Sequence, residues 1–453
     1  MSINKSLVIL MAVMLGNMAF AKISSKKPPN VIIIYSDDQG YADLNIYGSK
    51  DLITPNLDAL ARRGTRFTQF YAASPICSPS RASLLTGKYP QRAELVGNAP
   101  GMLGFKGGLP TAQYTMAEMF KDAGYKTAHV GKWHIGYAEE EMPLGQGFDY
   151  SFGFMGGCVD NYSHYYYWGG PNKHDLWENG EEIYREGEYF PDMMVDKASH
   201  FMEENKENPF FMYWAINLPH YPLQGKTDWL ERYKDLPSPR DKYAAAVSTV
   251  DEKVGELLKK LDELGLRENT IIIFQADQGY SKETRAFGGG GSAGIYRGSK
   301  FSVFEGGVRV PAFISWEGHL PENKVKDQLV TNVDWLPTLA ELCGIKSSPQ
   351  QIDGKSMVAL LNDKSDKNIH DTFYWQCLGT KEEPQWAVRD GDWKLMHKPI
   401  EAEKEELNKD GYFLVNLKEN PEENKNVADA NPDVVDRLHK KYQEWIKDVN
   451  ATQ

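Results

Sequence analysis

Short apolar runs alternate with longer stretches of helical periodicity between Val31 and about Cys343. Apolar runs without alternation are typical of strands buried on both faces, and the stretches between them are typical of the helices that cover a parallel sheet. The expected strands are 31–35, 125–130, 210–216, 270–275 and 310–315. The pattern therefore predicts an α/β fold with a large, mainly parallel sheet sandwiched between helices.

Three segments of this region carry helix signals. Thr54-Pro55 offers a cap followed by proline in the first turn, and Gly64 is expected to end that helix. Apolar residues recur at helical spacing over 241–264 and again over 331–342. We expect one short helix near the first strand and two amphipathic helices further along the chain.

The pattern changes after about residue 345. Apolar segments at 371–378, 385–397 and 411–417 are separated by polar loops rather than by helices, and helical spacing returns over 433–449. Strands joined without helices form antiparallel sheets. A chain of 453 residues is long enough for two domains. We therefore predict a large domain over 22–345 and a smaller α+β subdomain with an antiparallel sheet over 346–453.

The first 21 residues have the features of a secretory signal peptide. Lys5 precedes an apolar stretch over 7–15, and Ala19-Phe20-Ala21 offers a site for signal peptidase. The apolar stretch is too short to span a bilayer, and no cysteine for a lipid anchor lies near the cut. We expect an exported protein, periplasmic or secreted, with no membrane attachment after cleavage.

The composition restricts the partners and the disulfides. The formal net charge is −12, and loss of Lys5 with the signal peptide makes it −13. An acidic surface argues against nucleic acid as a partner. Four cysteines are too few for a disulfide framework. If Cys77 is used in chemistry, at most one disulfide forms among the other three, and its pairing stays open.

The most specific signal is the tract Cys77-Ser78-Pro79-Ser80-Arg81, which continues into Ala82-Ser83-Leu84-Leu85-Thr86-Gly87. A cysteine followed by proline at the second position and arginine at the fourth resembles the tract that sulfatase-maturing enzymes recognise. Those enzymes oxidise the cysteine to Cα-formylglycine, an aldehyde. The alternative is an unmodified cysteine at the start of a helix that carries proline in its first turn.

Polar residues gather after successive expected strands. Ligands of open α/β sheets bind beyond the carboxyl ends of the strands. Paired aspartates are often caps or turns, and single histidines and lysines are mostly solvated, but their placement at corresponding strand ends favours one common site. The residues are Asp37 and Asp38 after the first strand, Lys132 and His134 after the second, His220 after the third, Asp277 and Gln278 after the fourth, and Lys300 shortly afterwards.

Together these segments resemble the formylglycine-dependent sulfatases of the alkaline-phosphatase superfamily. The resemblance runs from Asn30 to Pro311 in order and spacing, and includes Gly131-Lys132-Trp133-His134 and Glu305-Gly306-Gly307. The chain departs from the family at Gln278, where asparagine or histidine is usual. Glutamine offers the same carbonyl oxygen on an arm longer by one methylene, roughly 1.5 Å.

The resemblance implies a sulfuric ester hydrolase with one Ca²⁺ per chain, held by Asp37, Asp38, residue 77, Asp277 and Gln278. Calcium prefers about 6–8 oxygen ligands in loose geometry, and zinc prefers nitrogen or sulfur, so this acid-rich set favours calcium. It also implies that a maturing enzyme acts on Cys77 before export. One hydroxyl of the hydrated aldehyde would attack sulfur, and the other would allow sulfate to leave again.

The resemblance also assigns roles to the basic residues. Arg81, one helical turn after residue 77, is expected to hold the hydrated aldehyde, and Lys132 and Lys300 to bind sulfate oxygens. His220 is the expected general acid toward the leaving alcohol, and His134 is expected to assist collapse of the sulfated intermediate.

The substrate is predicted from loops and from export. The aromatic run 162–168 either stacks on sugar rings or packs its loop onto the domain, and Gly288-Gly289-Gly290-Gly291-Ser292 is expected to be a mobile wall of the pocket. A sulfated poly- or oligosaccharide is favoured, and the glycine run resembles sulfatases of marine algal galactans such as carrageenan. The alternatives are a phosphodiesterase or phosphonate monoester hydrolase of the same superfamily, and an inactive sugar-binding homologue.

Overall fold

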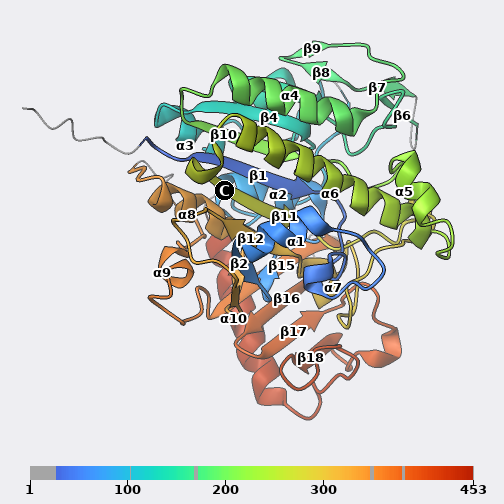
Figure 1. Ribbon diagram of the computed structural model, residues 1–453. Coiled ribbons are helices and arrows are strands. Elements are labelled where there is room, and N and C mark those ends of the chain that lie inside the picture. Colours follow the sequence, from blue (N-terminus) through green and yellow to red (C-terminus); the bar gives the residue numbers. More distant parts are fainter. Residues whose placement is uncertain (1–26, 103, 168–171, 347–350, 380–382, 452–453) are drawn as a thin grey trace, which may run out of the picture.

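The computed structural model describes residues 27–451 apart from 103, 168–171, 347–350 and 380–382. The expected signal peptide and Trp168 of the aromatic run lie outside the described residues. A ten-stranded sheet crosses the molecule, and a four-stranded sheet lies below it in the view of Figure 1. Within the described part, no helix has the length and apolar character needed to span a bilayer.

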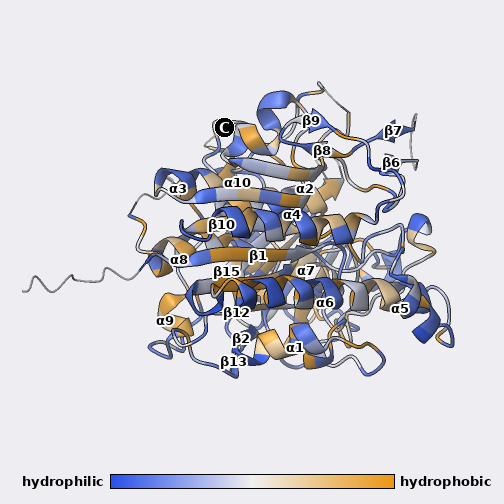
Figure 2. Cartoon of the chain, turned by 45° about the horizontal axis from the view of Figure 1, so that its top comes forward, coloured by the Kyte–Doolittle hydropathy of each residue, from blue (hydrophilic) through white to orange (hydrophobic). Residues whose placement is uncertain are grey.

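Five parallel strands form the middle of the large sheet. Their order is β11 (Thr270–Ala276), β1 (Asn30–Ser36), β10 (Phe210–Ala215), β4 (Lys126–Lys132) and β5 (Tyr150–Phe154). All of β1 is buried, and its alternate residues join two different cores on the two faces of the sheet. This arrangement explains the continuous apolar run at 31–35, which Figure 2 shows as a hydrophobic strand, and it confirms the predicted fold class.

Further strands extend both edges of this parallel centre. At one edge β12 (Ala312–Ser315) pairs antiparallel with β11, β2 (Gly64–Phe67) antiparallel with β12, and β13 (Lys324–Lys326) parallel with β2. At the other edge β8 (Trp177–Glu178) pairs antiparallel with β5, and β9 (Glu181–Glu182) antiparallel with β8. The strand expected from residue 310 begins at Ala312 because Pro311 has no N–H to donate. Gly64 opens β2, where an added Cβ would lie 1.9 Å from the Ile314 carbonyl oxygen, so only glycine fits.

Helices cover both faces of the large sheet (Figure 1). One face is covered by α1 (Pro55–Arg62), α4 (Phe190–Glu204) and α6 (Arg240–Glu263), and the other by α2 (Cys77–Thr86), α3 (Met116–Asp122) and α8 (Trp335–Leu342). The helices expected at Thr54-Pro55 and over 241–264 are confirmed. The segment 331–342 begins with a 3-10 turn over Asn332–Asp334 before α8 starts.

The C-terminal sheet is antiparallel and has the order β15 (Thr372–Gly379), β16 (Pro384–Asp390), β17 (Trp393–His397) and β18 (Tyr412–Asn416). The single strand expected over 385–397 is a hairpin, because Gly391 adopts a left-handed conformation (φ +60°) between β16 and β17. Helix α10 (Pro432–Asn450) packs its apolar side on this sheet. The domain boundary near residue 345 stays a prediction.

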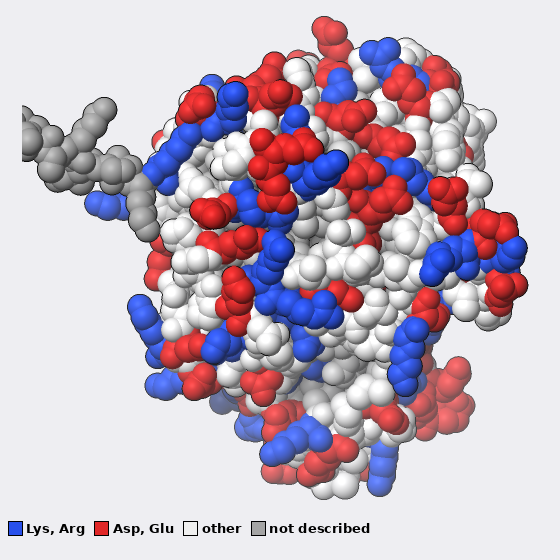
Figure 3. All heavy atoms as spheres, viewed as in Figure 1, with Lys and Arg blue, Asp and Glu red and all other residues white. Residues whose placement is uncertain are grey.

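Short elements complete the described chain. They are β3 (Phe70–Tyr71), β6 (Tyr165–Tyr166), β7 (Lys173–His174), α5 (Thr227–Arg232), α7 (Glu305–Val308), β14 (Val330–Thr331) and α9 (Val358–Leu361). On the face shown in Figure 3, acidic and basic side chains are interspersed. The net negative charge of the chain is therefore not gathered into one patch on that face.

Candidate active site

Four polar residues meet where β1 and β11 end. Asp37 and Asp38 follow β1, Asp277 and Gln278 follow β11, and the two strands are parallel neighbours in the sheet. The Asp38 backbone N–H, in a residue with φ of +58°, donates to Asp277 Oδ1 at 3.0 Å. Gln278 Nε2 donates to Asp38 Oδ1. All four side chains are buried, so the sheet topology creates a closed acidic cluster.

Three buried cations face these carboxylates. Arg81 Nη2 contacts Asp37 Oδ1 at 3.2 Å and Asp277 Oδ2 at 2.8 Å. Lys132 Nζ lies 2.7 Å from Asp37 Oδ2, and Lys300 Nζ lies 2.9 Å from Asp38 Oδ2. Charge pairing on this scale is what allows such groups to be buried at all.

The pKa values of the three aspartates are shifted in different directions by this environment. Burial opposes ionisation of Asp37, but the positive charges of Lys132, Arg81 and Lys300 hold its pKa well below the usual range. Burial raises the pKa of Asp38 to about 7, against the attraction of Lys300. Burial and the Asp37 charge raise the pKa of Asp277 to about 6. Burial thus disfavours the ionised forms of Asp38 and Asp277, and a cation bound at their oxygens would favour those forms.

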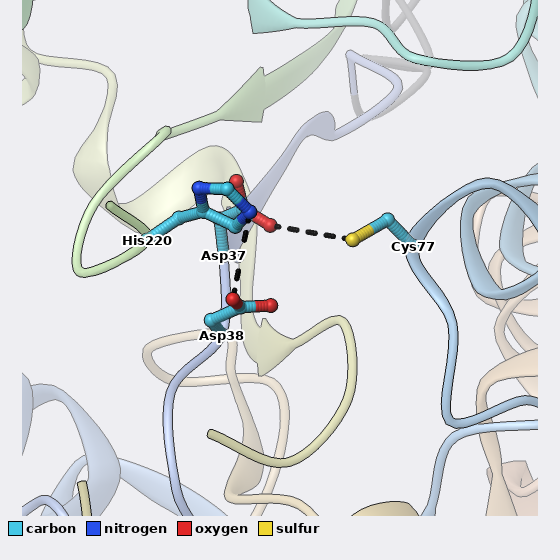
Figure 4. A group of neighbouring side chains, drawn as sticks. All are labelled: Asp37, Asp38, Cys77 and His220. Carbon is cyan, nitrogen blue, oxygen red and sulfur yellow. Dashed lines mark hydrogen bonds and ion pairs between the residues drawn. The ribbon is translucent and has the colours of Figure 1, made fainter. Parts of the chain in front are cut away.

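Cys77 is the first residue of α2 and points at this cluster. Its Sγ lies 3.9 Å from Asp37 Oδ1, and Figure 4 shows the side chain directed toward that carboxylate. Burial raises the pKa of the thiol to about 12, so the group is a neutral thiol at pH 7 and a poor nucleophile. Pro79 in the first turn needs no N–H partner, and the helix places Arg81 one turn beyond residue 77.

His220 lies above Asp38, as Figure 4 shows, and its ring is also a neighbour of Lys300. Its Nδ1 donates to the Tyr221 carbonyl oxygen at 2.7 Å, and its Nε2 lies 3.3 Å from Lys300 Nζ and 3.5 Å from Asp38 Oδ2. Burial lowers the pKa of His220 well below its usual value. In the free protein the ring is therefore neutral, with the Nε2 lone pair directed at the ammonium group.

His134 has a left-handed backbone (φ +57°), and its carbonyl oxygen accepts a hydrogen bond from Ser78 Oγ. Its Nδ1 is buried and has no hydrogen-bond partner in the described part of the chain. Burial and the charges of Lys132 and Arg81 lower the pKa of His134 well below its usual value. The predicted site residues are thus all brought together around residue 77.

The carboxylate and amide oxygens of this cluster fit a hard divalent cation. Ligand atoms of Asp37, Asp38, Cys77 and His220 all lie within 4.8 Å of one another. Gln278 Oε1 is buried and, among the described residues, no donor hydrogen-bonds to it. A spare amide oxygen beside carboxylates matches the preference of Ca²⁺ for oxygen ligands. The longer arm of glutamine therefore reaches the cluster.

A cavity of about 850 Å³ opens from Cys77, His134, His220 and Lys300. Its wall also carries the aromatic residues Tyr137, Tyr165, Tyr166, Trp177, Tyr184, Tyr221 and Phe301. Within the aromatic run, Tyr165 and Tyr166 line the cavity, and Tyr162 packs on the domain by stacking on Tyr189 with ring centroids 5.0 Å apart. Stacking of the run on sugar rings stays a prediction.

The glycine run 288–292 does not belong to the lining of this cavity, contrary to expectation. An added Cβ at Gly290 would lie 2.8 Å from the Tyr243 side chain, and Ser292 N–H donates to Asp43 Oδ2 at 2.8 Å. The run is packed against α6 rather than placed over the site.

Sequence reasoning missed several residues of the cavity wall. Glu283 Oε2 lies 3.6 Å from Lys300 Nζ, and Arg285 donates to Glu283 Oε1 at 2.7 Å and lies over the Tyr221 ring. Lys173 enters from the β6–β7 hairpin. Of these residues, only Tyr221 could have been identified from the sequence, because it is next to His220. The others come from loops that carry no motif.

The segment that carries Lys300 is held by the C-terminal part of the chain at four residues on both sides of it. Lys300 itself therefore depends on that part for its position. The contacts are Arg297 to Glu406 at 2.7 Å, Ser299 Oγ to Glu401 at 2.7 Å, Gln385 Nε2 to the Phe301 carbonyl oxygen at 2.5 Å, and Lys394 to Glu305 at 2.9 Å.

Known proteins match this chain over both sheets. The family model described as Sulfatase matches residues 29–345, and the model described as N-sulphoglucosamine sulphohydrolase, C-terminal, matches residues 293–448. Human arylsulfatase A is 34% identical over 408 residues, 83% of this chain and 76% of that protein. N-acetylgalactosamine-6-sulfatase of Rattus norvegicus is 34% identical over 372 residues, 77% of this chain and 68% of that protein.

Two solved structures resemble the fold closely. Ps i-CgsB in complex with k-i-k-neocarrahexaose has a TM-score of 0.82 and 32% identity, covering 92% of this chain and 93% of that chain. The PsFucS1 sulfatase from Pseudoalteromonas sp. has a TM-score of 0.77 and 25% identity, covering 94% and 91%.

Proposed function

Because the chain belongs to the sulfatase family and is a sulfuric ester hydrolase, we propose that it removes sulfate from a sulfated carbohydrate with a formylglycine made from Cys77 and one Ca²⁺. One observation carries the proposal. Residue 77 lies between a buried acidic cluster and an aromatic-lined cavity, with Lys300 and His220 on the same wall. A sulfate ester placed there meets cations, a metal site and residue 77 at once.

The state of Cys77 supports the modification. A buried neutral thiol beside Asp37 lacks the thiolate character that a cysteine nucleophile needs. Hydrated formylglycine would supply a nucleophilic oxygen and a second hydroxyl for release of sulfate. Arg81, fixed by Asp37 and Asp277, would hold that group, and Lys132 and Lys300 would neutralise the sulfate oxygens.

We assign the proton transfers to the two histidines. A bound sulfate ester brings a negative charge against Lys132 and Lys300, which cancels part of the repulsion that depresses the pKa of each ring. His220 Nε2 can then carry the proton that the leaving alcohol needs, with Nδ1–H still held by the Tyr221 carbonyl oxygen. His134 would serve collapse of the sulfated intermediate.

Calcium would be held by Asp37, Asp38, residue 77, Asp277 and Gln278, and it supplies Lewis acidity and orientation of a sulfate oxygen. Metal analysis of the purified protein should give one Ca²⁺ per chain, and two zinc ions per chain would overturn the assignment. Asp38→Ala and Asp277→Ala should abolish turnover. Gln278→Asn should retain it, because the same amide oxygen remains.

A carbohydrate substrate is supported by the size and lining of the cavity. Tyrosine and tryptophan side chains can stack on sugar rings, and about 850 Å³ is more than a small aryl sulfate requires. Ps i-CgsB, at 32% identity, was crystallised with k-i-k-neocarrahexaose, which supports a sulfated algal galactan such as carrageenan. Export through the predicted signal peptide would place the enzyme with such polymers, and a maturing enzyme would act first.

The experiment combines mass spectrometry with a substrate panel. Protein produced with a competent maturing enzyme should contain the aldehyde at residue 77, and it should hydrolyse at least one member of a panel of sulfated oligosaccharides. Full activity with an unmodified cysteine would overturn the mechanism. Faster turnover of a phosphodiester or phosphonate monoester than of any sulfate ester would overturn the sulfated substrate.

A further inference from the structure

Lys173 is a cavity-lining lysine without a carboxylate partner. It lies in β7, where it pairs in register with Tyr166 of β6. Its Nζ lies 5.0 Å from the centre of the Tyr137 ring and 5.3 Å from that of Tyr166. No carboxylate of the described residues lies within 4.0 Å of this nitrogen, unlike Lys132 and Lys300 deeper in the site. Two aromatic rings therefore hold an ammonium group whose charge is not paired.

Asp175, two residues further on, is the nearest acid in sequence, but its oxygens serve other donors. Oδ1 accepts from Tyr137 OH at 2.6 Å, from Trp177 Nε1 at 2.9 Å and from Met155 N–H at 3.0 Å. Oδ2 accepts from Gly156 N–H at 2.8 Å. Asp175 thus fixes the surrounding wall and acts on Lys173 only through space. Burial lowers the pKa of Lys173, as expected for a cation lacking a close anion.

Lys173 and the catalytic end of the cavity are separated by two adjacent glycines. A Cβ added at Gly156 would lie 3.8 Å from Lys173 Nζ, and one added at Gly157 would lie 3.1 Å from the His134 ring. A Cβ at Gly101, on another wall segment, would lie 3.4 Å from the same ammonium. A sugar whose sulfate reaches residue 77 can therefore present another substituent to Lys173.

We propose that Lys173, held between Tyr137 and Tyr166, binds a second anionic group of the substrate, a sulfate ester or a carboxylate on the same or the adjoining sugar. This proposal rests on the proposed function and names its substrate class as glycans with at least two anionic groups close together. The subsite makes no contact with the bond that is cleaved. It should therefore act on binding and leave the chemical step unchanged.

The test is calorimetric binding to protein in which residue 77 remains cysteine, so that ligand is not consumed. The probes are monosulfated and disulfated neocarra-oligosaccharides of equal length, and a monosulfated glycosaminoglycan disaccharide that carries a uronate. Wild-type protein should bind at least one doubly anionic probe more tightly than the monosulfated oligosaccharide. Lys173→Met should weaken that binding about tenfold and leave the monosulfated probe unchanged, because one charge-assisted hydrogen bond is lost.

Lys173→Arg should restore most of the preference for the doubly anionic probe over the monosulfated one. If the disulfated oligosaccharide is the probe affected by Lys173→Met, the second group is a sulfate; if the uronate-containing disaccharide is affected, it is a carboxylate. Lys121→Met is the matched control, since Lys121 is partly exposed and paired with Asp149 outside the cavity lining. Equal loss on singly and doubly anionic probes, or no loss on either, overturns the subsite. Failure of matured wild-type enzyme to hydrolyse any sulfate ester would instead overturn the proposed function.

Discussion

Replacement of Lys394 by methionine should destabilise the protein by about 3 kcal/mol or more at pH 7. Lys394 and its partners Glu305 and Glu423 are completely buried. Lys394 Nζ lies 2.9 Å from Glu305 Oε1 and 3.1 Å from Glu423 Oε1. Methionine keeps the length of the stem and removes only the charge, which leaves two carboxylates facing each other without the shared cation.

The size of the stability loss depends on the partners that Glu305 and Glu423 keep in the variant. Breaking a buried ion pair by removal of one partner costs about 3–5 kcal/mol. Glu305 keeps Arg309, whose Nη1 lies 3.1 Å away, but Glu423 loses its cation. Burial already raises the pKa of Glu423 to about 7 with Lys394 in place, so in the variant this carboxyl takes up a proton. Protonation limits the loss near pH 7, which places the expected value at the lower end of the range.

The stability loss of Lys394→Met should depend on pH because Glu423 has a raised pKa. A carboxyl whose pKa is raised on folding binds more protons in the folded state, so its contribution to stability falls as the pH rises through the folded pKa. The deficit of Lys394→Met relative to wild type should therefore grow between pH 7 and pH 8.5. A deficit that shrinks over this interval would show that Glu423 is not the group left unpaired.

Differential scanning calorimetry measures the effect. With an unfolding entropy of about 2.1 cal/mol/K per residue, about 3 kcal/mol corresponds to a lower melting temperature by about 3 °C in a chain of this size. Lys282→Met, which breaks the partly exposed pair with Glu401, should cost less than about 1 kcal/mol. Adding Glu423→Gln to Lys394→Met should recover part of the loss. A melting temperature for Lys394→Met equal to that of the Lys282→Met control would refute the reasoning.

Two further predictions concern histidines. His220→Ala should lower turnover of a sulfated sugar by about 10²–10⁴-fold and turnover of nitrophenyl sulfate much less, because a good leaving group needs little protonation. Steady-state assays on the two substrates measure this difference. Equal losses on both would show that His220 is not the general acid. Burial lowers the pKa of His129 to about 3, so the folded state binds fewer protons and wild type should lose about 3 kcal/mol between pH 6.5 and pH 4. His129→Leu should show a shallower decline in denaturation experiments over that interval, and an unchanged slope would contradict the assignment.

The sequence predicted the centre of the fold because buried parallel strands are apolar on both faces. β1 is the clearest case, since its alternate residues enter two different cores. The hairpin between β16 and β17 was missed for a local reason. Asp390-Gly391-Asp392 is a turn signal between two apolar segments, so it marks two strands where a single strand over 385–397 was predicted.

The cluster at the strand ends was predictable for a topological reason. Residues such as Asp37 and Asp277 are far apart in sequence but follow parallel neighbours, so the register of β1 and β11 brings them together. Lys173 lies in the short strand β7 and Arg285 in a 3-10 turn over Thr284–Ala286, so neither stands directly at the end of a strand of the parallel centre. Their positions depend on loop packing, which the periodicity of the chain does not encode.

The position of Lys300 depends on residues that lie outside the sequence motifs. Lys300 reaches Asp38 only because its own segment is anchored, at Ser299 by Glu401 and at Glu305 by Lys394. These partners lie roughly one hundred residues later, in the region that carries the antiparallel sheet. A change in that sheet can therefore displace the Lys300 ammonium group without replacing Lys300 or Asp38. The antiparallel sheet is in this sense a structural support of the candidate site.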